Sequence, residues 1–161
     1  MSVVIANRQR KKKINTRLLK QIVGGLFAEL NISAAELGIN LVAVPEMTLV
    51  NESFLQHEGS TDVITFDHKG SGARSQEPEL QLHGELFVCV DDAVWQAKKF
   101  GSSWQSEIIR YIVHGILHLL GHDDLKPHLR RRMRRDENRL VRALSRRFSL
   151  AQIGRTPKIG A

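Results

Sequence analysis

The residues best suited to chemistry lie in the stretch HGILHLLGHDD, residues 114–124, which sets three histidines and two aspartates into an apolar run. His114 and His118 are four residues apart, so on a helix their side chains share one face, a turn apart. Two imidazoles so arranged can direct ring nitrogens at one cation, about 2.0–2.1 Å from each in a zinc site. Such an ion would turn the cost of burying two titratable groups into binding energy.

A third ligand is available in the turn that follows the histidine pair. Gly121 lets the chain reverse, which would bring His122, Asp123 and Asp124 back toward the two imidazoles. Zinc accepts both imidazole nitrogen and carboxylate oxygen, so this turn would complete a three-ligand site with its fourth position open. The alternative is a hydrogen-bonded structural cluster without a metal.

The residue after His114 argues against a zinc protease. Metalloproteases with an HExxH motif use that glutamate as their general base, whereas this chain has Gly115. A glycine inside a helix costs about 1 kcal/mol relative to alanine. We therefore expect Gly115 to serve either close backbone packing or the space beside a metal.

The histidine pair is predicted to lie on a central, largely buried helix. Residues 104–120 are apolar on most sides, with Ser102 or Ser103 as the N-cap and Gly121 as the stop. The remaining predicted helices are 16–30, 47–55, 91–100 and 127–148, and the predicted strands are 2–7, 39–45, 63–66 and 86–90. This mixed order predicts an α/β or α+β fold, a mixed four-stranded sheet packed with helices.

The length of 161 residues predicts one compact domain, placed at residues 1–150, with residues 151–161 as a flexible C-terminal tail. The single Cys89 lies in an apolar run and is expected to fill core space. No apolar run approaches the roughly 20 residues of a membrane span. The N-terminus is apolar first and basic second, the reverse of a secretory signal, which favours a cytoplasmic protein.

The net charge of +7 is concentrated in two basic clusters. The first comprises Arg8, Arg10, Lys11, Lys12, Lys13, Arg17 and Lys20; the second comprises Arg130, Arg131, Arg132, Arg134, Arg135, Arg139, Arg142, Arg146 and Arg147. Such clusters favour a polyanionic partner, nucleic acid first and an acidic membrane surface second. The simpler alternative is a solvated helix face. Trp95 and Trp104 are expected to pack in the core, which leaves no aromatic platform for bases.

Beyond these patterns, HGxLHLxG followed by a histidine/aspartate turn resembles the signature of the YbeY family, bacterial metal-dependent endoribonucleases of ribosomal RNA maturation. STDVITF at 60–66 and the segment 83–101 are also similar to family blocks. Glu107 stands seven residues before His114, as in the family, and Met133, Glu137 and Leu140 match the closing helix. The resemblance covers roughly residues 40–145.

The resemblance implies a compact α/β domain with a metal at one end of a cleft. It implies one Zn²⁺ per chain and a single-strand-specific endoribonuclease that acts on ribosomal RNA, at the 3′ end of 16S rRNA, and in ribosome quality control. The partners would be RNA and the ribosome, with no membrane. Two rival functions remain open: a ribosome-associated RNA-binding factor whose metal is structural, and a metal-dependent hydrolase of another substrate.

The chain departs from the family at the third ligand. The family usually has a histidine six residues after the second one, and here that position is Asp124. His122 is the rival, at a place where the family often has tyrosine. Because the register with the family is unbroken, the predicted ligands are His114, His118 and Asp124.

A second departure concerns substrate contact. The family commonly has Tyr-Arg where this chain has Phe54-Leu55, so the arginine expected to approach the substrate phosphate is missing. Arg110 is either an electrostatic substitute or an ion-pair partner of Glu107. His57 is either a substrate contact or a surface histidine.

The sequence identifies no general base. The predicted RNA contacts are backbone phosphate contacts from the two basic clusters, above all from Arg130, Arg131, Arg134 and Arg135.

Overall fold

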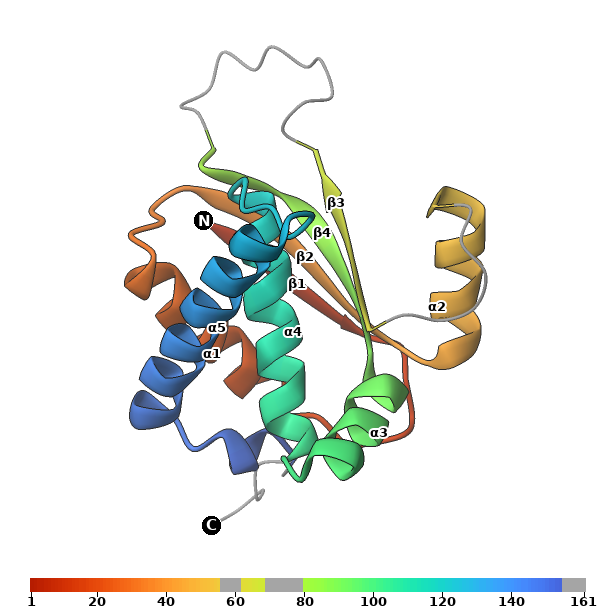
Figure 1. Cartoon of the computed structure of the whole chain (residues 1–161). Coiled ribbons are helices and arrows are strands. Elements are labelled where there is room, and N and C mark those ends of the chain that lie inside the picture. Colours follow the sequence, from red (N-terminus) through yellow and green to blue (C-terminus); the bar gives the residue numbers. More distant parts are fainter. Residues whose placement is uncertain (56–61, 69–79, 155–161) are drawn as a thin grey trace.

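The computed structural model describes residues 1–55, 62–68 and 80–154 (Figure 1). The strands are β1 (Ser2–Asn7), β2 (Ala35–Val42), β3 (Val63–Asp67) and β4 (Leu82–Cys89). The helices are α1 (Thr16–Glu29), α2 (Val44–Val50), α3 (Val90–Phe100), α4 (Trp104–Leu119) and α5 (Pro127–Arg147), with a π-helical turn η1 (Asn51–Leu55) and a 3₁₀ turn η2 (Leu150–Gly154).

The four strands form one mixed sheet, as the sequence predicts, and their order in it is β1-β2-β4-β3. β1, β2 and β4 run parallel, and β3 pairs antiparallel with β4 at the edge. Parallel neighbours need a crossover, and α1 supplies the one between β1 and β2. The sheet therefore combines a parallel α/β core with one antiparallel edge strand.

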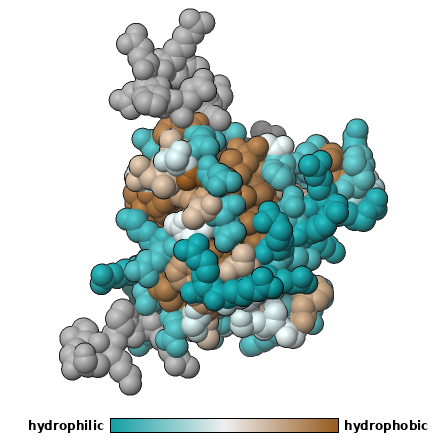
Figure 2. Space-filling view, turned by 90° about the vertical axis from the view of Figure 1, so that its left-hand side faces the viewer, coloured by the Kyte–Doolittle hydropathy of each residue, from teal (hydrophilic) through white to brown (hydrophobic). Residues whose placement is uncertain are grey.

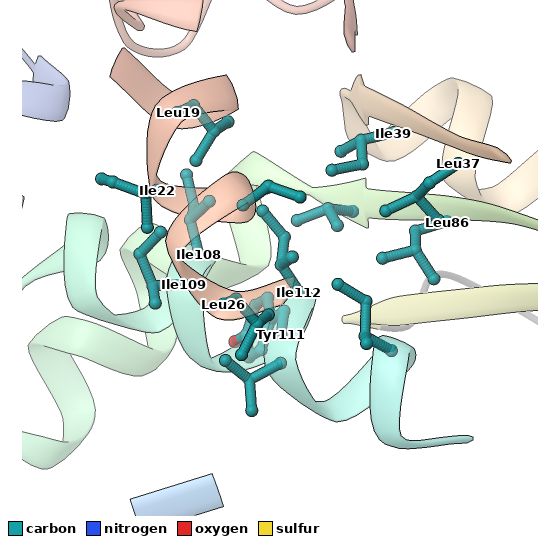
Figure 3. Packing of buried hydrophobic residues seen from close by; sticks show 14 of the residues in the cluster. Leu19, Ile22, Leu26, Leu37, Ile39, Leu86, Ile108, Ile109, Tyr111 and Ile112 are labelled. Carbon is teal, nitrogen blue, oxygen red and sulfur yellow. The ribbon is translucent and has the colours of Figure 1, made fainter. Parts of the chain in front are cut away.

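Helices α1, α4 and α5 lie on one side of the sheet and α2 on the other (Figure 1). The main core fills the space between the sheet and the first group, where side chains of α1, α4 and the central strands interdigitate (Figure 3). The residues labelled there are Leu19, Ile22, Leu26, Leu37, Ile39, Leu86, Ile108, Ile109, Tyr111 and Ile112. A smaller cluster, which includes Met47 and Cys89, lies under α2.

Two predictions from the sequence were wrong at this level. Trp95 is 58% exposed rather than in the core, because the buried positions of α3 fall on the opposite side of that helix. Residues 151–154 do not belong to a free tail: they complete η2, where Ile153 is fully buried and its carbonyl accepts a hydrogen bond from Asn15 N at 2.8 Å. Residues 155–161 lie outside the described part of the chain.

The second helix begins earlier than predicted, at Val44 instead of Met47. Pro45 suits a first helical turn because its fixed φ is helical and its missing N–H needs no partner there. The Asp91 carboxylate accepts a hydrogen bond from Val44 N at 3.0 Å, which satisfies one of the free donors at this helix start.

Helix α4 carries the histidine pair and begins and ends where the sequence predicts. The Ser103 hydroxyl accepts a hydrogen bond from Ser106 N at 3.1 Å, and Gly121 takes a φ of 98° just after the helix. A Cβ added to Gly115 would lie 2.7 Å from Leu86 Cδ2 and 3.2 Å from Thr65 Cγ2. Gly115 therefore serves close packing of α4 against β3 and β4.

We predict that Gly115→Ala lowers the free energy of unfolding by about 1–2 kcal/mol, because overpacking against the fully buried Leu86 outweighs the helix propensity gained. The matched control is Gly24→Ala in α1, where an added Cβ meets nothing within 4 Å. That variant should gain about 0.5–1 kcal/mol. Urea denaturation measures both, and a stabilised Gly115→Ala would contradict the close packing.

Candidate metal centre

Three side chains from α4 and the turn after it meet at one point. His114 Nε2 and His118 Nε2 are 3.0 Å apart, and Asp124 Oδ2 lies 3.7 Å and 3.4 Å from them. Within the described ranges these are the residues whose ligand atoms, all within 4.8 Å of one another, could hold a metal ion. Each side chain is about one third exposed, so an ion between them would be open to solvent on one side.

The spacing of these donor atoms suits a tetrahedral ion. Two ligands at 2.0–2.1 Å from a tetrahedral zinc are separated by roughly 3.3 Å, and the three observed separations, 3.0, 3.4 and 3.7 Å, lie around that value. Two imidazole nitrogens and one carboxylate oxygen are also donors that zinc accepts. The residues therefore fit a single zinc-type ion, and we call His114, His118 and Asp124 together the ligand group.

Helix α5 supports His114 through the ring nitrogen that does not face the other two ligand residues. Glu137 Oε2 lies 3.1 Å from His114 Nδ1, and Glu137 is itself buried. A proton on Nδ1 donated to this carboxylate leaves the Nε2 lone pair directed at the ligand group, as metal-bound histidines require. Burial lowers the pKa of His114, but the hydrogen bond to Glu137 and nearby carboxylate charges raise it more, so the pKa lies above its usual value.

His122, the rival third ligand, points elsewhere. Its Nδ1 lies 3.9 Å from Asp136 Oδ2 on α5. The turn after Gly121 thus brings Asp124, and not His122, to the histidine pair.

Arg110 is held by α5 and not by its predicted partner. Its Nη1 donates to Asn138 Oδ1 at 2.8 Å and lies 3.9 Å from Glu137 Oε1. Glu107 instead accepts a hydrogen bond from Ser102 Oγ at 2.8 Å. The predicted ion pair between Arg110 and Glu107 is therefore wrong.

Sequence reasoning missed the roles of Glu137 and Asn138, which lie more than twenty residues beyond the ligand histidine. The sequence did contain one signal for the role of Glu137. Met133, Glu137, Leu140 and Leu144 share the buried face of α5, so the spacing puts an acid among apolar positions. A buried acid needs a partner, and here the partners are His114 and Arg110.

A pocket of about 460 Å³ opens between α3, α4 and α5, with His114 in its wall. Its lining residues come from all three helices and from the residue just before β3: Asp62, Gln96, Phe100, Glu107, Arg110, Tyr111, His114, Arg134, Glu137 and Asn138. The ligand group therefore borders a hollow large enough for part of a substrate.

A second hollow of about 460 Å³, which we call the arginine groove, runs along α5. It is lined by Arg131, Arg134, Arg135, Asn138, Arg139, Arg142 and Arg146. Arg134 and Asn138 also line the first pocket, so the two hollows are adjoining. Figure 2 shows the side of the molecule that carries α1 and α5, where strongly hydrophilic side chains form a band.

The other predicted contacts are placed differently. Arg130 is exposed but does not line the arginine groove. Arg8, from the first basic cluster, pairs with Glu46 at 2.6 Å and donates to Asn40 at 3.0 Å, so it ties β1 to β2 and α2. His57 and the Leu55 side chain lie outside the described residues. None of the helices in the described ranges is long and apolar enough to span a membrane.

The sequence of this chain matches one family of known proteins. The family model described as "Endoribonuclease YbeY" matches residues 4–145, so the chain belongs to this family. Among relatives of that name, the protein of Kineococcus radiotolerans is 36% identical over 78% of this chain and 73% of its own length. The protein of Bacteroides thetaiotaomicron is 33% identical over 81% of this chain and 87% of its own length. The protein of Chlorobium phaeovibrioides is 37% identical over 61% of this chain and 61% of its own length.

A solved structure shows the same fold. The solution structure of TM1509 from Thermotoga maritima superposes with a TM-score of 0.65, covers 99% of both chains and is 22% identical. At that identity the comparison supports the architecture, a mixed sheet with helices on both sides.

We predict that Glu137→Gln weakens Zn²⁺ binding about 10- to 100-fold, because a neutral amide supports His114 less well than a carboxylate. Competition with a chromophoric chelator measures the Kd. Asp136→Asn is the matched control: its carboxylate, one residue away, faces His122, so the variant should bind Zn²⁺ as the wild type does. Equal affinities for all three proteins would show that Glu137 does not support the ion.

Proposed function

We propose that this chain is a single-strand-specific, zinc-dependent endoribonuclease that acts in ribosomal RNA processing, at the 3′ end of 16S rRNA, and in ribosome quality control in the cytoplasm. The observation that carries the proposal is the convergence of His114, His118 and Asp124 in a chain of the YbeY family. The adjoining arginine groove supports RNA as the substrate.

In this proposal His114, His118 and Asp124 hold one zinc ion per chain. When bound, the ion supplies Lewis-acid polarisation of a phosphoryl oxygen and lowers the pKa of water. Glu137 keeps His114 in the tautomer that presents Nε2, and Arg110 places a positive charge beside Glu137 in the pocket wall. Arg110 can thereby partly replace the phosphate-binding arginine that the family has at the position of Leu55.

The basic side chains hold the RNA backbone. Arg131, Arg134 and Arg135 line the arginine groove, and Arg130 adds an exposed charge nearby. Contacts with phosphates fix the position of a strand but carry no sequence information. We therefore assign the choice of cleavage site to the ribosomal setting.

We predict that His114→Ala abolishes cleavage of single-stranded RNA but changes RNA affinity less than about threefold, because the arginines supply most of the binding energy. Asp124→Ala should lose the metal, whereas His122→Ala should retain one zinc per chain. Elemental analysis of untagged protein purified without chelators measures the metal. Gel assays measure cleavage, and fluorescence anisotropy measures binding.

Two outcomes would overturn parts of this proposal. Loss of metal in His122→Ala alone would make His122 the third ligand. Wild-type protein that carries one metal and binds RNA with steep salt dependence, yet never cleaves it, would be an RNA-binding factor with a structural metal. The Leu55 position favours that alternative function, since the family arginine is absent there.

We also predict that Arg131→Gln reduces the slope of log Kd against log salt by about 0.7, the value for one phosphate contact on a single strand. Arg132→Gln is the matched control, an adjacent exposed arginine of α5 that does not line the arginine groove. Anisotropy titrations at several salt concentrations measure both slopes. Equal changes in the two variants would mean that the whole helix, and not the groove, attracts RNA.

A further inference from the structure

The pocket beside His114 contains groups that neither the metal centre nor phosphate binding uses. Gln96 and Phe100, four residues apart on α3, line one wall, and Tyr111 of α4 lines another. A flat ring, an amide and a phenol are groups that contact a nucleobase well.

Phe100 is an exposed aromatic ring at this pocket, 69% accessible to solvent. A large apolar side chain left in water loses the stabilisation that burial would give. Lys99 Nζ lies 5.4 Å from the centroid of this ring and 5.0 Å from that of Trp95. An aromatic surface with a cation therefore stands next to the pocket, contrary to the expectation from the sequence.

Tyr111 supplies a second, independent sign of a ligand. It is only 5% exposed, yet its hydroxyl has no hydrogen-bond partner within the described part of the chain. Buried hydroxyls nearly always have a partner, so an unpartnered one on a residue that lines the pocket is suited to a ligand that displaces the side chains covering it. Burial and nearby carboxylates raise the pKa of Tyr111, so the phenol stays protonated and able to donate.

The charges of the pocket suit a base as well as the phosphate beside it. Three carboxylates line it, those of Asp62, Glu107 and Glu137, against two guanidinium groups, those of Arg110 and Arg134. A phosphate needs the arginines or the proposed metal beside it, whereas a base is neutral and its N–H donors can face these carboxylates. The neighbouring arginine groove has the opposite character, since no carboxylate among the described residues lines it.

We propose that this pocket is a subsite for one unstacked base of an RNA strand. The base stacks on Phe100, its edge bonds to the Tyr111 hydroxyl and the Gln96 amide, and the adjoining phosphate lies on Arg134, which lines both hollows. The inference rests on the proposed function, because it takes RNA to be the substrate. It explains a preference for single strands: a base paired in a duplex cannot enter the pocket.

The test compares Phe100→Leu, Phe100→Tyr and Tyr111→Phe for binding to a 2′-O-methyl RNA strand, checked to be uncut, by fluorescence anisotropy. Phe100→Leu keeps apolar bulk but loses the flat face, so affinity should fall about tenfold, and Phe100→Tyr should restore it. Tyr111→Phe should weaken binding about fivefold while the Tm stays unchanged or rises, because removing an unpartnered buried hydroxyl does not destabilise the fold.

A strand of the same length without bases provides the decisive control. Neither Phe100→Leu nor Tyr111→Phe should change its affinity, and Leu49→Ala, an exposed apolar position on α2, should leave binding to both strands unchanged. Equal losses on the two strands, or none on the strand with bases, would overturn the base subsite. If the wild type still cleaves RNA in that case, the proposed function stands. A wild type that binds neither strand would overturn both.

Discussion

Helix α4 has to be buried on nearly every side and still present two imidazoles to a ligand. It lies between the sheet, α3 and α5, and Gly115 lets it approach β3 and β4 so closely that a methyl group would collide with Leu86. Close-packed interiors do not deform continuously, so this contact fixes where α4 lies along its own axis and how it is rotated about that axis. The directions of His114 and His118 follow from that rotation, and so does the side on which Asp124 returns.

A buried polar edge on such a helix is stable only when its groups have partners. Helix α5 provides them, since Glu137 meets His114 and Asn138 meets Arg110. The same side of α5 carries Met133, Leu140 and Leu144 into the core. The packing that stabilises the fold therefore also sets the position of the carboxylate behind the candidate ligand. A change that shifts α5 would affect the ligand group without touching it.

The sequence predicted what depends on local spacing. The four strands, the long apolar helix, its serine cap and the pair of histidines one turn apart all follow from periodicity and capping within a few residues. The convergence of Asp124 with that pair followed from the turn and from the resemblance. The prediction for Trp95 was wrong because it depended on which face of a helix is covered: Trp95 is apolar, but α4 packs on the other side of α3. The support from Glu137 depends on how α5 crosses α4, which spacing along one helix does not determine.

Several arginines of α5 stand at positions that lower the stability of the helix. Arg146 and Arg147 in the last turn complement the negative end of the helix dipole, whereas the first turn has no acidic residue. Arginines four residues apart, such as Arg131 with Arg135, repel each other and cost a few tenths of a kcal/mol per pair. Solubility needs only scattered charge, and a helix face built for stability would alternate signs. The described structure compensates this repulsion by core packing on the opposite face of α5. A polyanion along the arginine groove would remove the repulsion altogether, which is why we interpret these charges as a binding surface and not as a solvated face.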